Sequence, residues 1–141
     1  MSFTTAMRFL DTNILLYAVS TAAEEEPKAK IALHLLEQDD WNLSIQVLQE
    51  FYVQATRASR DDRLSHTHAV ALIESWLRFR IQETTVPVLQ GALALRERYG
   101  LSFLDCTILS AARTAGCREV YSEDLAHERD YDGVRVINPF R

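Results

Sequence analysis

The sequence predicts an α/β protein with a mainly parallel central sheet. Short apolar segments typical of buried strands alternate along the chain with segments in which apolar residues recur at helical spacing. Helices between strands are the usual connections of a parallel sheet, because parallel neighbours need a long crossover. In this architecture ligands bind beyond the carboxyl ends of the strands, and Asp11 and Asp124 lie just past two predicted strands. The sequence therefore predicts both a fold class and a place for a site.

Two strands and four helices are expected in the first part of the chain. An apolar run at residues 7–10 predicts a strand that ends at Asp11, and Pro27 is well placed to open a helix. Ser44 can cap the helix that follows a very short second strand. The expected strands are 7–10 and 43–45, and the expected helices are 12–20, 27–38, from Ser44 to about residue 59, and 66–79.

Three strands and two helices are expected in the remainder. Residues 81–85 are rich in β-branched side chains, which favours a strand. Pro87 stands near the start of a helix that Gly100 ends, and Ser102 can cap the next helix, which Gly116 ends. The expected strands are 81–85, 118–122 and 134–137, and the expected helices are 86–99 and 103–115.

Composition indicates one globular domain spanning residues 1–141, with a loose overhang at residues 1–6. Hydrophobic residues make up 48% of the chain and charged residues 25%, which excludes disordered and fibrous classes. Because neither a secretory signal pattern nor a membrane-length apolar run is present, we expect a cytoplasmic protein without membrane contact. Cys106 and Cys117 lack a metal-binding or redox spacing and are expected to be core residues.

The net charge of −5 argues weakly against a polyanionic partner, since basic residues normally drive phosphate binding. Acidic residues cluster at 24–26 and 37–40, whereas Arg57, Arg60 and Arg63 form a basic run elsewhere. A solvated helix face is the simpler explanation of any single arginine. A polyanion would therefore have to be held locally, for instance through a metal ion, rather than attracted by a basic surface.

Two aspartates stand next to apolar residues, and each also has a local explanation. Asp11 lies between apolar segments but can cap the following helix, as can Thr12 or Asn13. Asp105 falls at the edge of the apolar stripe that begins at Leu104 in its helix and is expected to face the core, where an unpaired carboxylate is costly. With Ser102 it also fits a capping box, although glutamate suits that motif better.

Two further acids are ordinary when taken alone. Glu50 lies off the apolar face of its helix, on the flank that it shares with Gln54 and Arg57, where a solvated glutamate is expected. Asp124 follows a strand, where a turn-forming aspartate is common, and Glu123 is a rival for any role of Asp124. The functional hypothesis therefore depends on the acids as a set.

Taken together, Asp11, Glu50, Asp105 and Asp124 predict a divalent-cation site. Converging carboxylates repel one another and stay ionised only with a compensating cation. Oxygen ligands with retained waters suit Mg²⁺ or Mn²⁺. Such an ion lowers the pKa of a bound water and stabilises the oxygens of a phosphodiester displacement, so no nucleophilic side chain is required.

Five segments of the chain resemble the motifs of PIN domains, a family of metal-dependent ribonucleases. Each motif alone is weak, but the five occur in order from Met7 to the C-terminus, and together they are specific. The segments are FLDTNIL at 9–15, QVLQEFY at 46–52, LSFLDC at 101–106, SEDL at 122–125 and VINPF at 136–140.

The resemblance implies a three-layer α/β/α fold, Mg²⁺ or Mn²⁺ as cofactor and RNA as substrate. In the mechanism that we expect, Asp11 and Asp105 are the principal ligands, and Asp124 binds directly or through water. Glu50 holds a coordinated water or a second ion, cleavage leaves a 3′-hydroxyl and a 5′-phosphate, and Arg57 is a candidate for phosphate contact. The family's acids correspond to Asp11, Glu50, Asp105 and Asp124, and its small polar residues to Thr12, Asn13 and Ser122.

A single PIN domain of this length most resembles the VapC toxins of bacterial toxin–antitoxin pairs. That resemblance implies a homodimer and a cognate antitoxin that inserts into the active-site groove. One alternative is a non-catalytic PIN-fold module that docks a partner helix in an apolar groove. Another is a haloacid-dehalogenase-like phosphatase, which needs Asp-x-Asp where this chain has Asn13. Such a phosphatase also needs a lysine near the end of the chain, but the only lysines are Lys28 and Lys30. The same missing lysine argues against a phosphoacceptor receiver domain, a signalling module.

Overall fold

The computed structural model describes residues 7–141, so the overhang expected at residues 1–6 lies outside the described residues. A 3₁₀ turn (Ala23–Glu25) precedes the second helix. The strands are β1 (Arg8–Leu10), β2 (Trp41–Ser44), β3 (Arg80–Gln82), β4 (Glu119–Tyr121), β5 (Asp130–Tyr131) and β6 (Val134–Ile137). The helices are α1 (Thr12–Ala18), α2 (Glu26–Leu36), α3 (Ile45–Thr56), α4 (His66–Trp76), α5 (Val86–Tyr99) and α6 (Phe103–Thr114).

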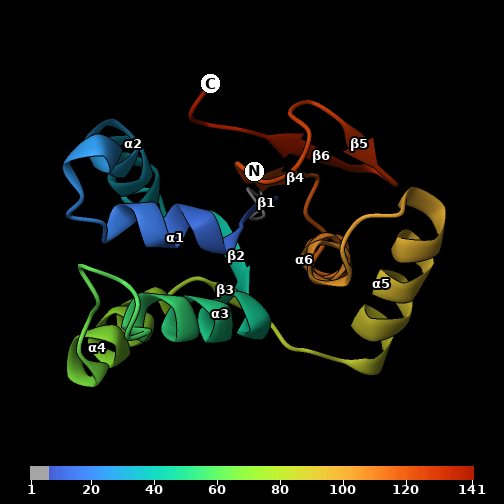
Figure 1. Cartoon of the computed structure of the whole chain (residues 1–141). Coiled ribbons are helices and arrows are strands. Elements are labelled where there is room, and N and C mark those ends of the chain that lie inside the picture. The colour runs from blue at the N-terminus through green and yellow to red at the C-terminus, as the bar shows by residue number, and fades with distance from the viewer. Residues whose placement is uncertain (1–6) are drawn as a thin grey trace, which may run out of the picture.

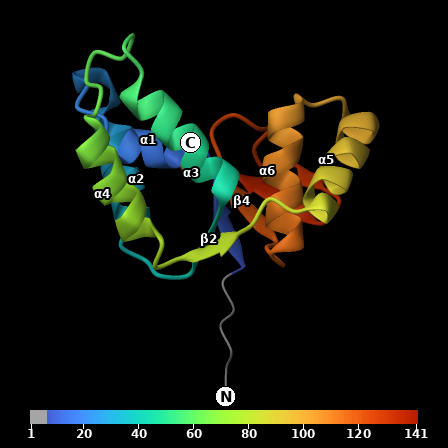
Figure 2. The same cartoon turned by 90° about the horizontal axis from the view of Figure 1, so that it is seen from below.

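Three layers form the domain, with the sheet between α1–α4 on one face and α5 and α6 on the other (Figures 1 and 2). The strand order is β3-β2-β1-β4-β6-β5, and the pairing of β5 with β6 is antiparallel whereas the others are parallel. The predicted three-layer α/β/α fold with a mainly parallel sheet is therefore confirmed.

The chain reverses its direction across the sheet between β1 and β4. From β1 it proceeds outward to β2 and β3 through α1–α4, and it then returns through α5 and α6 to place β4 beside β1. Right-handed crossovers in opposite directions put their helices on opposite faces of a sheet. The carboxyl ends of β1 and β4 therefore border the switch point where such folds bind ligands.

Several predicted elements end at other residues than expected. Ser44 and Thr85 have extended backbone, but their hydroxyls accept from the amides of Val47 and Val88 and cap α3 and α5. The second strand ends at Ser44 and the third at Gln82, whereas the predicted strands ran on to residues 45 and 85. The predictions ran too far because an N-cap residue has the same extended backbone as a strand residue. In addition, α1 to α4 end two or three residues earlier than predicted.

The hairpin of β5 and β6 was not predicted. Its loop consists of Asp132 and Gly133, with φ angles of 53° and 96°. Two successive residues with positive φ match the right-handed twist of the flanking strands, and Asp-Gly is a favoured pair at this place. The dipeptide is therefore the sequence signal for the missed strand.

The strands carry the centre of the core. Phe9, Leu10, Leu43 and Val120 have no exposed surface, because helices cover both faces of the sheet. Both cysteines are buried and free, as expected. Across residues 7–141, no helix is both long and apolar enough to cross a bilayer.

The two helices on the second face pack closely at Gly91. A Cβ atom at this position of α5 would lie 2.5 Å from Oγ of Ser110 on α6. That hydroxyl is buried and donates a hydrogen bond of 2.7 Å to the carbonyl of Val88, so it cannot turn away without leaving a buried polar group unpaired. The absence of a side chain at Gly91 thus sets the approach of α5 to α6.

Gly91→Ala is expected to lower the free energy of unfolding by roughly 1–3 kcal/mol, the usual cost of overpacking. In the Ser110→Ala background the contact is relieved, because Cβ of residue 110 would be 3.5 Å away. There the same change should stabilise by about 0.5–1 kcal/mol, since alanine favours a helix interior. Urea denaturation of the four proteins of this cycle measures both numbers, and equal effects of Gly91→Ala in the two backgrounds would disprove the contact.

Candidate functional site

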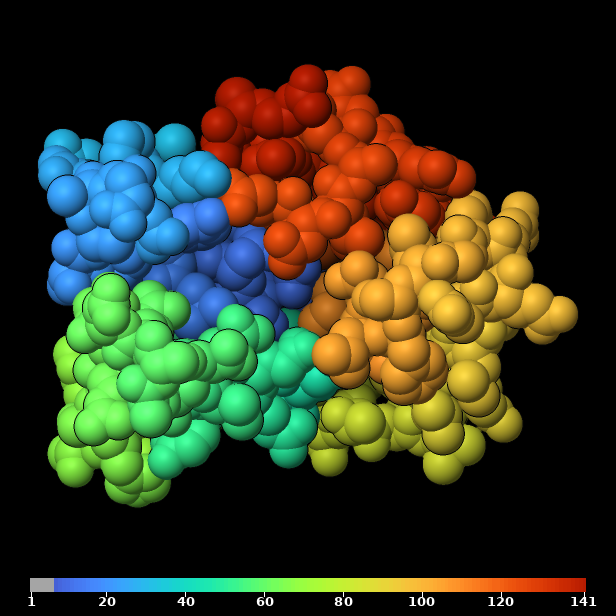
Figure 3. Space-filling view, viewed as in Figure 1, coloured from blue at the N-terminus to red at the C-terminus, as the bar shows by residue number. Residues whose placement is uncertain are grey.

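A pocket lies at the carboxyl ends of β1 and β4. Figure 3 looks onto this edge of the sheet, where α1, α3, α6 and the segment after β4 surround a hollow. All four acids that the sequence singles out line this pocket, although they come from four separate segments. The lining consists of Asp11, Thr12, Asn13, Leu16, Glu50, Gln54, Ser102, Leu104, Asp105, Ile108 and Asp124.

Asp11 is the most buried of the four acids, with 5% of its surface exposed. It caps α1 by accepting from the Thr12 amide at 2.7 Å, and it also accepts from the Ser122 hydroxyl at 2.7 Å. Burial raises its pKa to about 7, and the charges of Asp124 and Asp105 add to the rise, while the two hydrogen bonds oppose it. The cap and the pocket therefore use the same carboxylate.

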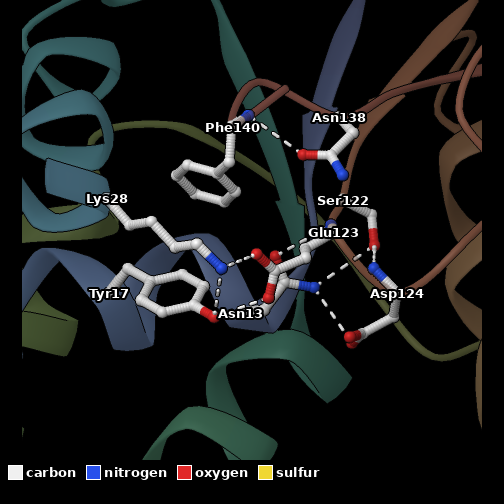
Figure 4. Close-up of polar contacts among 8 residues, drawn as sticks. All are labelled: Asn13, Tyr17, Lys28, Ser122, Glu123, Asp124, Asn138 and Phe140. Atoms are coloured by element: carbon white, nitrogen blue, oxygen red, sulfur yellow. Dashed lines mark hydrogen bonds and ion pairs between the residues drawn. The ribbon is translucent and has the colours of Figure 1, made fainter. Parts of the chain in front are cut away.

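Asn13 and Ser122 join the start of α1 to the segment after β4 (Figure 4). The Ser122 hydroxyl donates to Asp11 and accepts from the Asp124 amide at 3.1 Å and from Nδ2 of Asn13 at 3.2 Å. Nδ2 of Asn13 also donates to Oδ2 of Asp124 at 3.0 Å. These small polar residues thus hold Asp11 and Asp124 in a fixed relation.

Glu50 reaches the pocket from the side of α3. Burial raises its pKa, the charge of Asp105 adds to the rise, and a hydrogen bond of 3.4 Å from Gln46 opposes it. The Thr12 hydroxyl also lies near enough to oppose the rise, although no hydrogen bond shorter than 3.5 Å joins it to Glu50. Gln46 and Gln54 lie one helical turn to either side of Glu50, a spacing from which the sequence could have placed them here.

Asp105 stands in the first turn of α6. Its backbone amide donates to the Ser102 hydroxyl at 3.2 Å, so Ser102 caps the helix, while the Asp105 carboxylate lines the pocket. Leu104 was expected on the apolar stripe that faces the core. It is instead 57% exposed, because the pocket opens beside it.

Asp124 and Glu123 were rivals in the sequence, and the structure separates them. Asp124 lines the pocket, whereas Glu123 accepts from the Tyr17 hydroxyl at 2.5 Å and pairs with Lys28 (Figure 4). Burial acts to raise the pKa of Glu123, but the contacts with Lys28 and Tyr17 together outweigh burial, and the pKa is lowered. This carboxylate therefore stays ionised. No local pattern links Lys28 to Glu123, and sequence reasoning missed this contact.

Arg57 and Cys106 do not take part in the pocket. Arg57 is exposed at the end of α3 and is not among the lining residues. Arg60 lines a groove that adjoins the pocket and shares Asn13 and Asp124 with it. Cys106 is fully buried and burial raises the pKa of its thiol, as is usual for a core cysteine that takes no part in chemistry.

The pocket fits a hydrated divalent cation. Within residues 7–141, no three carboxylate, imidazole or thiol groups lie close enough to enclose an ion by themselves. Mg²⁺ is usually bound by one or two carboxylates and keeps several waters, so it does not need such an enclosure. The buried Thr12 hydroxyl has no hydrogen-bond partner within the described part of the chain. The pocket thus offers carboxylate oxygens and the Thr12 hydroxyl oxygen as ligands for a cation.

Comparison with solved structures finds the same fold in three bacterial proteins. A toxin–antitoxin complex from Klebsiella pneumoniae contains a chain with 21% identity and a TM-score of 0.68, over 94% of this chain and 97% of that one. VapC20 of Mycobacterium tuberculosis, a toxin that cleaves the sarcin–ricin loop, has 22% identity and a TM-score of 0.64, over 83% and 89%. FitAcB from Neisseria gonorrhoeae has 19% identity and a TM-score of 0.64, over 95% and 99%.

Sequence comparison assigns the family. No curated protein matches the sequence. The model of the PIN domain, however, matches residues 8–131, which span all four acids and nearly all of the sheet. The chain therefore belongs to the PIN domain family.

Proposed function

We propose that this protein is an endoribonuclease that depends on Mg²⁺ or Mn²⁺, and that it is the toxin of a toxin–antitoxin pair. The observation that carries the proposal is the meeting of Asp11, Glu50, Asp105 and Asp124 in one pocket at the switch point of the sheet. Family membership supports nuclease chemistry, and the similar fold of an RNA-cleaving toxin supports RNA as the substrate.

The chain's own residues hold and orient the reacting groups in this proposal. Asp11 and Asp105 are the principal ligands, and Asp124 assists directly or through water. Glu50, whose pKa is raised, is placed to accept a proton from an attacking water. A bound Mg²⁺ or Mn²⁺ supplies positive charge that favours ionisation of water and stabilises the charge developing on the phosphodiester.

Two surfaces support the proposed partners. An apolar groove between α3 and α4 is lined by Leu48, Tyr52, Ile73 and Leu77 among others, and it offers a place for an apolar antitoxin segment. A toxin–antitoxin complex shares the fold. Exposed apolar side chains along α5 support the proposed homodimer, because contact with a second copy would remove them from water. They are Val86, Leu89 and Leu93.

The rival functions gain no support from the site. A haloacid-dehalogenase-like phosphatase would need a second aspartate at position 13, but Asn13 is engaged there by Ser122, Glu123 and Asp124. Lys28 is bound to Glu123 and is not among the residues that line the pocket. A pure binding module would not need four carboxylates in a pocket, where their mutual repulsion costs stability.

Asp105→Asn is expected to reduce the rate of RNA cleavage by more than roughly 100-fold. Loss of a residue that only supports a metal ligand costs about 10- to 100-fold, and the loss of a direct ligand should cost more. The change preserves shape and the backbone cap but removes the charge that attracts the cation. Cleavage of a labelled RNA by the purified protein in Mn²⁺ measures it. Asp39→Asn, at a side chain that is 88% exposed, is the matched control. Equal activity of the two variants would refute the role of Asp105.

The raised pKa of Asp11 predicts how stability depends on pH. The folded state holds a proton on Asp11 up to about pH 7, whereas the unfolded chain releases it near 3.8. Without added cation, the free energy of unfolding should therefore fall as pH rises from about 4 to 7, by on the order of 2–4 kcal/mol. Asp11→Asn should lose this component and be the more stable protein at pH 8.

Denaturant titrations of both proteins at pH 5 and pH 8 measure the difference. Adding Mg²⁺ at pH 8 should stabilise the wild-type protein more than Asp11→Asn, because the variant lacks one of the two principal carboxylate ligands. If the free energy of unfolding of the two proteins depends on pH in the same way, ionisation of Asp11 does not destabilise the folded state as predicted.

A further inference from the structure

We infer that Lys28 and Tyr17 are positioning residues for Asp124, and that they act by fixing Glu123 next to it. Asp124 is the most exposed of the four acids and lies in a bend just after a strand of three residues. Within this segment the Ser122 hydroxyl accepts from the Asp124 amide at 3.1 Å. Contacts from other elements add to that bond, such as the one from Asn13 to the Asp124 carboxylate. The inference rests on the proposed function only in taking Asp124 as a residue of the site.

Glu123 is bound at both of its carboxylate oxygens (Figure 4). The Tyr17 hydroxyl, on α1, donates to Oε1 at 2.5 Å, and the Lys28 ammonium, on α2, pairs with Oε2. Lys28 also donates to the Tyr17 hydroxyl at 3.4 Å. Two helices thus hold one carboxylate from the segment after β4, and the cluster of Tyr17, Lys28 and Glu123 is called the clamp below.

The C-terminal segment covers the clamp. The ring of Phe140 meets that of Tyr17 edge to face, with centroids 5.0 Å apart, and the Lys28 nitrogen lies 5.7 Å from the Phe140 centroid. The Lys28 and Glu123 side chains are accordingly only 41% and 26% exposed. A single ion pair in full solvent contributes little, but a partly covered pair with a further hydrogen bond holds its geometry better.

The clamp reaches Asp124 through Asn13. The Glu123 amide donates to Oδ1 of Asn13 at 3.2 Å. Because a backbone N–H can only donate, this bond fixes the carbonyl side of the Asn13 amide and turns Nδ2 toward the pocket. Nδ2 then donates to Oδ2 of Asp124 at 3.0 Å. Holding Glu123 therefore fixes both the backbone and the carboxylate of Asp124 before a cation arrives, so less ordering is needed on binding.

The test compares Lys28→Met and Tyr17→Phe with Lys30→Met in the full chain. Lys30 lies on the same helix, is 76% exposed and pairs with Glu26, so it is the matched control. In metal-free protein, hydrogen exchange should accelerate at the amides of residues 123 and 124 in both clamp variants. Mn²⁺ affinity measured by calorimetry should fall about 10-fold, as for other outer-shell partners of a metal site, and Lys28→Arg should restore most of it.

RNA cleavage should need more Mn²⁺ in the clamp variants, with the KM for RNA unchanged. The inference is overturned if Lys28→Met and Lys30→Met exchange at the same rate at residues 123 and 124, or bind Mn²⁺ equally. Should the wild-type protein cleave no RNA, the proposed function fails by itself. The exchange rates would still decide whether Lys28 and Tyr17 hold Asp124.

Discussion

The burial of an ionisable carboxylate at the end of β1 is the constraint on which the site depends. Asp11 has 5% of its surface exposed and faces the charges of Asp105 and Asp124, which raises its pKa to about 7. Two short hydrogen bonds, from Ser122 and Thr12, offset part of the cost. The remaining cost of ionising Asp11 at neutral pH is what a bound cation would relieve.

The sheet places this carboxylate where it can be used. Parallel pairing sets Leu10 of β1 opposite Tyr121 of β4, so the next residues, Asp11 and Ser122, meet at the same edge. The Asp11 amide donates to the Tyr121 carbonyl at 3.0 Å, which continues the strand pairing up to the pocket. Residues more than a hundred positions apart are thus brought together by strand register rather than by local sequence. The helices α3 and α6 add Glu50 and Asp105 from either face.

Much of this arrangement could be predicted from the sequence because it follows from local patterns. Apolar periodicity gave the alternation of strands and helices, and the ends of predicted strands indicated Asp11 and Asp124. The caps at Ser44 and Ser102 follow from residue type and spacing. The end of β3 was missed because Thr85, a helix cap, has the extended backbone of a strand residue. The hairpin was missed because its turn at Asp132 depends on positive φ angles, which apolar patterns do not show.

Long-range contacts between polar side chains could not be predicted. Lys28 and Glu123 are 95 positions apart, and each alone is an ordinary surface residue. The orientation of the Asn13 amide likewise depends on the Glu123 backbone, which no spacing rule supplies. Local sequence alone therefore left Glu123 and Asp124 as rivals, because both follow the same strand. The resemblance to PIN domains selected Asp124, and Asp124 is the one that lines the pocket.

Anomalous scattering from crystals of this protein soaked in Mn²⁺ would test the central claim most directly. If the shared repulsion of the four carboxylates is what a cation relieves, a peak should lie in the pocket within coordination distance, about 2.2 Å, of Asp11 and Asp105 oxygens. A pocket without a peak in crystals that bind Mn²⁺ at other acidic residues would contradict the claim.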